Sequence, residues 1–287
     1  MLNALNRGYR VKYDYDKILR CFTSQLSTNY TFVDIEKRAE KIYSINLRNK
    51  PVNALGLEFM VDIANALKEL ERNDDCKAVM FVSNLETFSA GFQSNELLTQ
   101  DLKRMESFWS TAQNLGLSIL KTPLITASAV EGSCIAGGCY FPFLSDISVM
   151  SSSDKLRIGI AATRMGIVPP KILLLPLQNL VGFRKAEFYA SRSILLKPEE
   201  AHKCGMIQTV VPRSEVLKTA INQINLYLQI PESGLLENKR LFNAKILQEI
   251  DNESFLKAEV KDFCDRLQEP ETQQKMQSHF DKFSKRN

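Results

Sequence analysis

Two short turns rich in small residues constrain this chain more than any other feature of its sequence. The first is Phe88–Gly91, and the second runs over 131–139 and contains Gly137 and Gly138. Each turn follows a strongly apolar run that is typical of a buried strand, and each leads into a helix-like run. Small residues let a ligand approach the backbone closely, and the first turn of a helix leaves N–H donors unpaired. Two such turns that met at one point would form an oxyanion hole, which stabilises negative charge on a carbonyl oxygen.

The apolar pattern around these turns predicts alternating strands and helices. Short apolar runs predict strands over 41–49, 77–83, 124–130, 146–151 and 207–211. Apolar residues at helical spacing predict helices over 57–72, 97–121, 182–190 and 198–203, and the pattern is helical from 215 almost to the end. Strands and helices in this order favour right-handed crossovers and a parallel sheet. We therefore predict an α/β core with a helical C-terminal layer.

Composition and motif spacing argue against several other classes of protein. The formal net charge is only +4 and no Lys/Arg-rich tract occurs, so nucleic acid is not expected as a partner. No apolar run reaches the roughly 18 residues of a membrane span. The six cysteines form no C-x-x-C pair and the only histidines are His202 and His279, so no metal site is expected. Gly137 and Gly138 lack the dinucleotide-binding spacing, so no flavin or nicotinamide cofactor is expected either.

The N-terminal residues form a separate segment. Residues 1–12 contain three basic residues and no acid, and Arg20, Cys21 and Phe22 follow further on, which is typical of a mitochondrial presequence with its processing site. Asp14 and Asp16 are unusual in such a segment, and the alternative is a disordered or strand-like arm. We divide the chain into this segment (1–28), an α/β core (29–212) and a C-terminal helical region (213–287), and we expect a location in the mitochondrial matrix.

The ordered set of motifs resembles the crotonase superfamily, also called the enoyl-CoA hydratase/isomerase family. The similarity covers about 43–212 and includes the turn over 49–55, both small-residue turns, Asp146 with its strand, and the segment 158–169. The Cys-x-Ala-Gly-Gly-Cys form over 134–139 is similar to the mitochondrial enoyl-CoA delta isomerase branch. The resemblance implies a crotonase-like ββα spiral core, a homotrimer, and an acyl-CoA thioester as ligand without any further cofactor.

The resemblance also implies a reaction. The N–H groups of Ala90 and Gly137 would hold the thioester carbonyl oxygen, and Ser89 and Gly138 would bind substrate beside them. Loss of an α-proton would then give an enolate, and return of the proton would convert a 3-enoyl-CoA to the 2-trans-enoyl-CoA in fatty acid β-oxidation. The alternative is that the glycines only ease tight packing between helix and sheet.

The sequence departs from the family at the residues that carry protons. The hydratases use two glutamates, whose positions fall here on Tyr140 and Ala162, and the isomerases need only the second. Tyr140 therefore fits an isomerase, where it could donate a hydrogen bond to substrate or simply pack. Alanine cannot accept a proton, and a positioned base contributes roughly 10²–10⁴ in rate. The general base is therefore missing at Ala162, which leaves turnover in doubt.

Few other residues could compensate for this loss. Glu131 could be a relocated base or a solvated loop acid, and Glu96 could lie near the mouth of the first turn or merely start a helix. Arg164 could hold an anion, such as a carboxylated acyl-CoA, or be an ordinary surface residue. Ser133 and Thr163 have no histidine near them in sequence, so a hydrolase triad is not supported.

Three functions remain open after this comparison. The first is an isomerase that uses a substitute base, and the second is a catalytically impaired homologue that binds acyl-CoA. The third is another crotonase reaction, such as acyl-CoA decarboxylation, which needs enolate stabilisation but no base to remove an α-proton.

Overall fold

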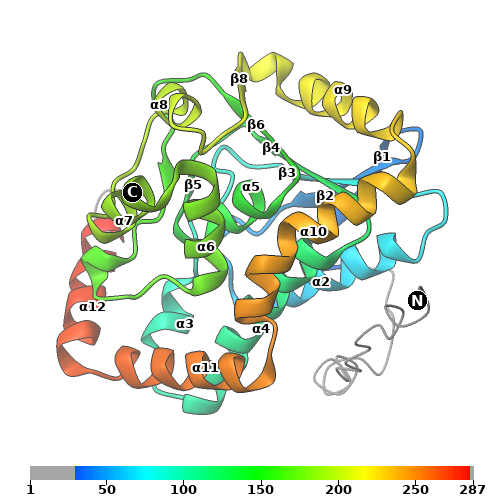
Figure 1. Cartoon of the computed structure of the whole chain (residues 1–287). Helices are drawn as coiled ribbons and strands as arrows, with labels where there is room; N and C mark the ends of the chain where they lie inside the picture. Colours follow the sequence, from blue (N-terminus) through cyan, green and yellow to red (C-terminus); the bar gives the residue numbers. More distant parts are fainter. Residues whose placement is uncertain (1–29, 285–287) are drawn as a thin grey trace. The chain divides into compact units, whose positions relative to one another are not determined.

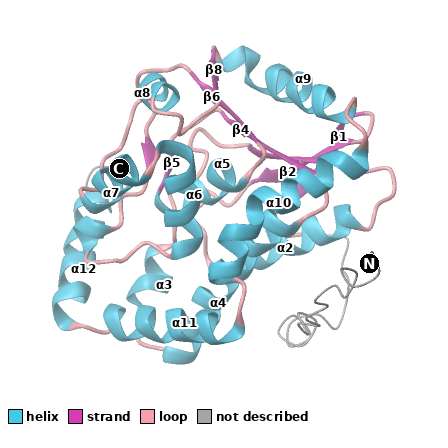
Figure 2. Cartoon of the chain, in the orientation of Figure 1, coloured by secondary structure: helices cyan, strands magenta, loops and turns pink. Residues whose placement is uncertain are grey.

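The computed structural model describes residues 30–284, so the segment predicted as a presequence or arm over 1–28 lies outside the described residues. Six strands form one sheet in the order β1-β2-β3-β4-β6-β8, and β5 pairs with β7 in a separate two-stranded sheet (Figure 2). The strands are β1 (Val33–Ala39), β2 (Ile42–Leu47), β3 (Ala78–Ser83), β4 (Ile125–Val130), β5 (Cys134–Ile135), β6 (Ile147–Ser151), β7 (Ile158–Gly159) and β8 (Thr209–Val211).

Apart from the antiparallel pair β1 and β2, neighbouring strands run parallel. Helical crossovers connect the parallel strands, as the alternating pattern predicts. From β2 to β6 the crossovers contain α2 (Leu57–Glu71), α3 (Ser94–Leu98), α4 (Leu102–Lys121), the 3₁₀ helix η1 (Ala136–Cys139) and α5 (Tyr140–Leu144). From β6 to β8 they contain η2 (Thr163–Met165), α6 (Lys171–Val181), α7 (Phe183–Ser191) and α8 (Pro198–Lys203).

The two faces of the main sheet pack against different helices because side chains alternate along each strand. Met80 and Val82 face the helix α9 (Val216–Leu228), whose Ala220 and Ile224 are fully buried against them. Phe81 points the other way, and its ring packs against Phe141 of α5 with centroids 4.9 Å apart. Figure 1 shows α9 along one side of the strands and α5 on the other. The core is therefore a sheet covered by helices on both faces.

The C-terminal helices surround this core. They follow the short η3 (Arg213–Glu215) and α9, and comprise α10 (Glu232–Ile250), α11 (Glu253–Leu267) and α12 (Pro270–Ser284). α10 packs on α6, α11 packs on α4, and α12 packs on α3 and η2 (Figure 1). Lys239 of α10 donates to Asp146 at 2.7 Å, and Thr126 Oγ1 donates to the same carboxylate, so Asp146 links the sheet to this layer. The predicted α/β fold with a helical C-terminal layer is confirmed.

The strand β1 and the helix α6 were absent from the prediction. The edge strand β1 is mostly polar and half-exposed, so it lacks the apolar run by which the other strands were recognised. The helix α6 begins directly after Pro170 and contains Pro176, a residue that usually ends a helix. Within the described residues, no helix has the length and apolarity needed to span a bilayer.

Candidate active site

The two small-residue turns lie side by side, as the oxyanion-hole interpretation requires. Ser89 and Cys134 form a parallel bridge. The N–H groups of Phe88 and Ser89 both donate to the carbonyl of Ser133, at 3.0 and 3.2 Å. In return the N–H of Ile135 donates to the carbonyl of Ser89 at 3.1 Å. Segments about 45 residues apart are therefore held together by backbone hydrogen bonds rather than by flexible side chains.

Asn53 holds the first turn in place through hydrogen bonds. Its side-chain amide donates to Ser83 Oγ at 2.9 Å and to the carbonyl of Phe88 at 3.0 Å. The hydroxyl of Ser89 donates to the Asn53 carbonyl at 2.8 Å, and both residues are fully buried. These hydrogen bonds between buried groups hold one backbone conformation, so the turn is preorganised.

Glycine is required where the two turns touch. Gly91 has a φ of 90°, and a Cβ there would lie 2.7 Å from Ala136 Cβ and 3.1 Å from the Gly137 nitrogen. A Cβ on Gly138 would lie 2.8 Å from the Ser89 carbonyl oxygen. Ser89 and Gly138, which we expected to bind substrate, thus pack against each other and hold the turns in contact. Neither residue lines the cavity described below.

The predicted donor at Ala90 needs revision. Its N–H donates to the carbonyl of Val52 at 2.9 Å, so this amide already has a partner inside the protein. Phe92, two residues further on, lies in an extended segment that pairs with Leu55. Leu55 bonds the carbonyl of Gly91 and the N–H of Gln93, so the Phe92 amide points to the opposite edge, where Gly91 meets Gly137. The Phe92 N–H has no hydrogen-bond partner among the described residues.

Gly137 lies at the start of η1, where a free N–H group is expected. It is the second residue of η1, and the first N–H groups of a helix have no partner within the helix. The preceding residue, Ala136, has a φ of 49°, which is uncommon for a residue with a side chain. Such strain is typical of sites where the surrounding structure imposes the backbone conformation. The N–H groups of Phe92 and Gly137 are therefore two neighbouring donors on the two turns.

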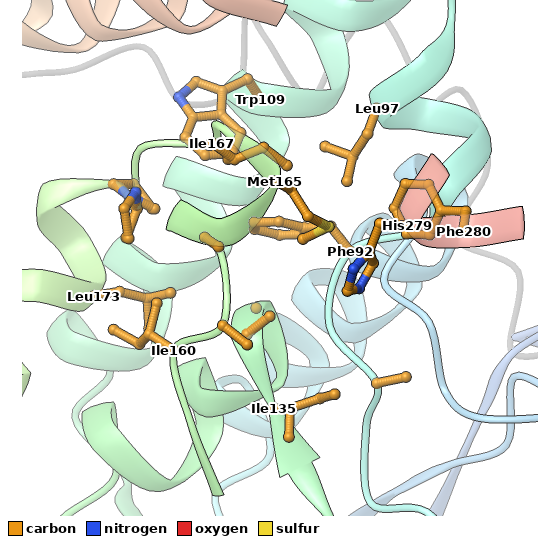
Figure 3. Close-up of a pocket in the computed structure, with 17 residues that line it drawn as sticks. Phe92, Leu97, Trp109, Ile135, Ile160, Met165, Ile167, Leu173, His279 and Phe280 are labelled. Carbon is orange, nitrogen blue, oxygen red and sulfur yellow. The ribbon is translucent and has the colours of Figure 1, made fainter. Parts of the chain in front are cut away.

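These donors border a small apolar cavity of about 90 Å³ (Figure 3). Ala90, Gly137 and Ala162 all line it, so three positions singled out in the sequence do come together. Most of the remaining lining is apolar and consists of Phe92, Leu97, Trp109, Ile135, Ala136, Ile160, Ala161, Met165, Ile167, Pro169, Pro170, Leu173 and Phe280. Among the described residues no carboxylate lines the cavity, so nothing in it replaces the family's glutamate by the same chemistry.

Tyr140 and Arg164 lie outside this cavity. The Tyr140 ring packs against Phe92 and is fully buried, and its hydroxyl has no hydrogen-bond partner among the described residues. Burial raises the pKa of this hydroxyl well above its usual value, and the negative charge of Glu259 adds to the shift. Arg164 is exposed, and its backbone N–H donates to Ser193 Oγ at 3.1 Å. The structure thus gives no contact between either side chain and the cavity.

The other acids considered as bases are occupied elsewhere. Glu131 accepts from Arg213 at 3.3 Å on the surface. Glu96 is buried and accepts from Arg104 at 2.6 Å and from the N–H of Leu57 at 3.0 Å, at the start of α2. It therefore acts as a helix cap for α2 rather than as a group in the cavity.

His279 lines the cavity from α12, although no pattern in the sequence pointed to it as a site residue. On this helix Thr272 and Met276 are buried, and His279 and Phe280 follow on the same face at helical spacing. Figure 3 shows His279 and Phe280 beside Phe92 and Met165. The sequence predicted a helix in this region, but it did not indicate which cavity the helix would meet.

A second cavity of about 420 Å³ adjoins the first. Trp109, Ile167, Pro169 and Pro170 line both, and Trp109 stacks on Phe263 of α11 with ring centroids 3.4 Å apart. The second cavity is largely apolar but carries charged side chains, namely Lys171, Glu259, Asp262 and Arg266. An elongated apolar group that entered the first cavity would have room to continue here.

Cysteines flank Gly137 without forming a reactive centre. The Cys134 thiol donates to the carbonyl of Gly138 at 3.1 Å and the Cys139 thiol to the carbonyl of Cys134 at 3.4 Å. Burial raises the pKa of the Cys134 thiol, with further contributions from Cys139, so it stays protonated. In the described part of the chain, no group of three or more His, Cys, Asp or Glu side chains could hold a metal ion.

The fold and the paired turns define a crotonase-type protein, and the comparisons with known proteins agree. The model of the enoyl-CoA hydratase/isomerase family matches residues 37–286, so the chain belongs to that family. It is 27% identical to human mitochondrial enoyl-CoA delta isomerase 1 over 239 residues. The aligned region covers 83% of this chain and 78% of the relative. The rat protein of the same name is 31% identical over 200 residues, or 69% of each chain.

Solved structures show the same likeness. The crystal structure of human mitochondrial delta3-delta2-enoyl-CoA isomerase superposes with a TM-score of 0.85 at 26% identity, covering 89% of this chain and 99% of that one. An enoyl-CoA hydratase from Bacillus halodurans superposes with a TM-score of 0.77 at 18% identity, covering 86% and 100%, which shows the shared fold alone.

Proposed function

We propose that this protein binds an acyl-CoA thioester and holds its carbonyl oxygen between the N–H groups of Phe92 and Gly137. The observation that carries the proposal is that the two turns are bonded to each other and leave these two amides without partners in the described protein, at the wall of an apolar cavity. Fixed donors of this kind lower the energy of an enolate, because they need no reorganisation when charge develops.

The acyl chain has a path away from the donors. It would enter the cavity of about 90 Å³, pass Trp109, and continue into the neighbouring cavity of about 420 Å³. Burial of apolar surface contributes about 25 cal/mol per Å², so an apolar path favours a fatty acyl chain over a polar one.

The reaction that this arrangement supports is the shift of a 3-enoyl-CoA to the 2-trans-enoyl-CoA in fatty acid β-oxidation. Support comes from the relatives named as enoyl-CoA delta isomerases. It also comes from Tyr140, which stands where a hydratase has an acid. Ala162 favours a second candidate, an impaired homologue that binds acyl-CoA without efficient turnover. Decarboxylation has less support, because the Arg164 side chain is exposed and lies outside the cavity lining.

We also propose a homotrimer in the mitochondrial matrix. The relatives named as mitochondrial support the location. Self-association would also cover exposed apolar side chains on α9, just beyond its end and on α10. These side chains are Leu226, Ile230, Leu241 and Phe242.

Calorimetric titration of the purified full chain with octanoyl-CoA, and separately with free CoA, tests the binding. A conjugated dienoyl-CoA adds a probe of the donors, because its absorption shifts to longer wavelength when its carbonyl is polarised. We expect saturable binding of the thioester and a red shift of the bound dienoyl-CoA. Binding of free CoA as tightly as octanoyl-CoA, without any red shift, would contradict the proposal.

A further inference from the structure

Among the described residues that line the cavity beside the Phe92 and Gly137 N–H groups, His279 is the one with a basic side-chain nitrogen. The lining includes no Asp, Glu, Lys or Tyr among the described residues. The imidazole lines the cavity together with Ala162, the residue that the family resemblance aligns with the catalytic glutamate. A neutral imidazole accepts a proton readily near neutral pH and returns it as an imidazolium.

The helix that carries His279 is fixed against the site. The buried Thr272 packs over Gly166, where an added Cβ would lie 3.2 Å from the threonine hydroxyl. Gln273 donates to the carbonyl of Leu97, and Met276 is fully buried one turn before His279. Phe280, beside His279, also lines the cavity. The position of the imidazole is therefore set by a packed helix face and not by a free chain end.

We propose that His279 is the proton carrier of this site and replaces the carboxylate missing at Ala162. The inference rests on the proposed function, because it requires a thioester held by Phe92 and Gly137. The imidazole removes a proton from C2 of a 3-enoyl-CoA, and the C–H electron pair becomes an enolate on the thioester oxygen. The imidazolium then returns the proton to C4, the double bond moves from C3–C4 to C2–C3, and neither oxidant nor water is consumed.

Two measurements on the full chain test this role. The first is the rate at which the α-protons of octanoyl-CoA exchange in deuterated water, followed by mass spectrometry. The second is the rate at which a trans-3-enoyl-CoA gains the absorbance of the conjugated thioester. His279→Ala and His279→Gln are compared with wild type, and His202→Ala is the matched control. His202 is the chain's other histidine, on α8, and Nδ1 lies 3.2 Å from the Ile207 carbonyl oxygen.

A positioned base contributes roughly 10²–10⁴ in rate. We expect both His279 variants to lose at least about 10² in exchange and isomerisation, with affinity for octanoyl-CoA within about twofold of wild type. His202→Ala should keep the wild-type rates. The double variant Ala162→Glu/His279→Ala should recover activity, which would show that the loss came from the base and not from a damaged fold.

The outcomes separate this inference from the proposed function. Wild-type protein that binds octanoyl-CoA and red-shifts the dienoyl-CoA, but exchanges no α-protons, would overturn the role of His279 and leave the binding intact. Exchange that continues unchanged in both His279 variants would also overturn the role of His279 and leave the binding proposal intact. Failure of wild type to bind octanoyl-CoA at all would overturn the proposed function, and the role of His279 with it.

Discussion

A Cβ atom on Gly137 would lie 2.9 Å from the ring of Phe92, the residue that carries the second free amide of the site. The Phe92 ring cannot move aside easily, because it packs against Phe108, Trp109 and Tyr140 with centroids 5.3–5.9 Å apart. In the proposed site Gly137 is therefore needed for two reasons. It supplies an N–H group, and it has no side chain that would displace Phe92. The two proposed donors are coupled through one close contact.

The substitution Gly137→Ala should damage the site through this contact. The new methyl group would push the Phe92 segment away and separate the two N–H groups. Loss of one oxyanion donor typically costs about 10²–10³ in rate, and we expect a loss of that size together with a smaller red shift of bound dienoyl-CoA. Gly234→Ala is the control, because a Cβ there meets nothing within 4 Å. Equal red shifts in wild type and Gly137→Ala would argue against Gly137 as a donor.

The substitution Ala162→Glu should return a carboxylate to the cavity. A positioned base is worth roughly 10²–10⁴, so the isomerisation of a trans-3-enoyl-CoA should accelerate within that range. The matched control is Ala161→Glu, since Ala161 also lines the cavity but stands one residue away from the family position. If Ala161→Glu gained as much as Ala162→Glu, the alignment of this segment with the family would be wrong.

The turns could be found from the sequence because their signal is local. Small residues after an apolar run, repeated once more at the next predicted strand, indicated a site that backbone pairing of Ser89 with Cys134 now explains. The sequence did not show which residue of the first turn has the free N–H group. Whether Ala90 or Phe92 offers a free N–H depends on Val52 and Leu55, which belong to an earlier segment that bonds alternate residues of the turn.

His279 could not be found from the sequence for a related reason. The sequence predicted only that this region is helical, whereas α12 packs on η2, more than 100 residues earlier in the chain. Tertiary packing determines such long-range contacts, and the local spacing of apolar residues does not identify the partner. The helix α6 is a different case, since it contains Pro176, a residue that usually ends a helix, and the packed structure tolerates it.

Arg104→Ala should destabilise the fold next to the first turn. Arg104 bridges the buried carboxylate of Glu96 and the exposed carboxylate of Glu58, and its hydrogen bond to Glu58 lowers the pKa of that carboxyl. Without the guanidinium, Glu96 would remain buried as an unpaired charge. Because Arg104 is itself partly exposed, we expect a loss of about 3 kcal/mol in the free energy of unfolding, the low end for breaking a buried pair.

Urea unfolding followed by circular dichroism measures this loss. Arg240→Ala is the control, because Arg240 pairs with Glu237 on the exposed surface of α10, where such pairs contribute little. A value for Arg104→Ala no larger than that for Arg240→Ala would show that the Glu96 cluster is not needed for stability.

Stability should also fall at alkaline pH. Burial raises the pKa of the Cys76 and Cys264 thiols from an ordinary value of 9.0 to about 11. Between these values the folded protein binds more protons than the unfolded chain, so the free energy of unfolding decreases as pH rises from about 9 to about 11. Below pH 9 both states keep these thiols protonated, and the contribution of the two groups is constant. Urea unfolding across this interval should show the decline, and the double variant Cys76→Ala/Cys264→Ala should show a shallower one. An identical slope in wild type and double variant would assign the alkaline loss to other groups.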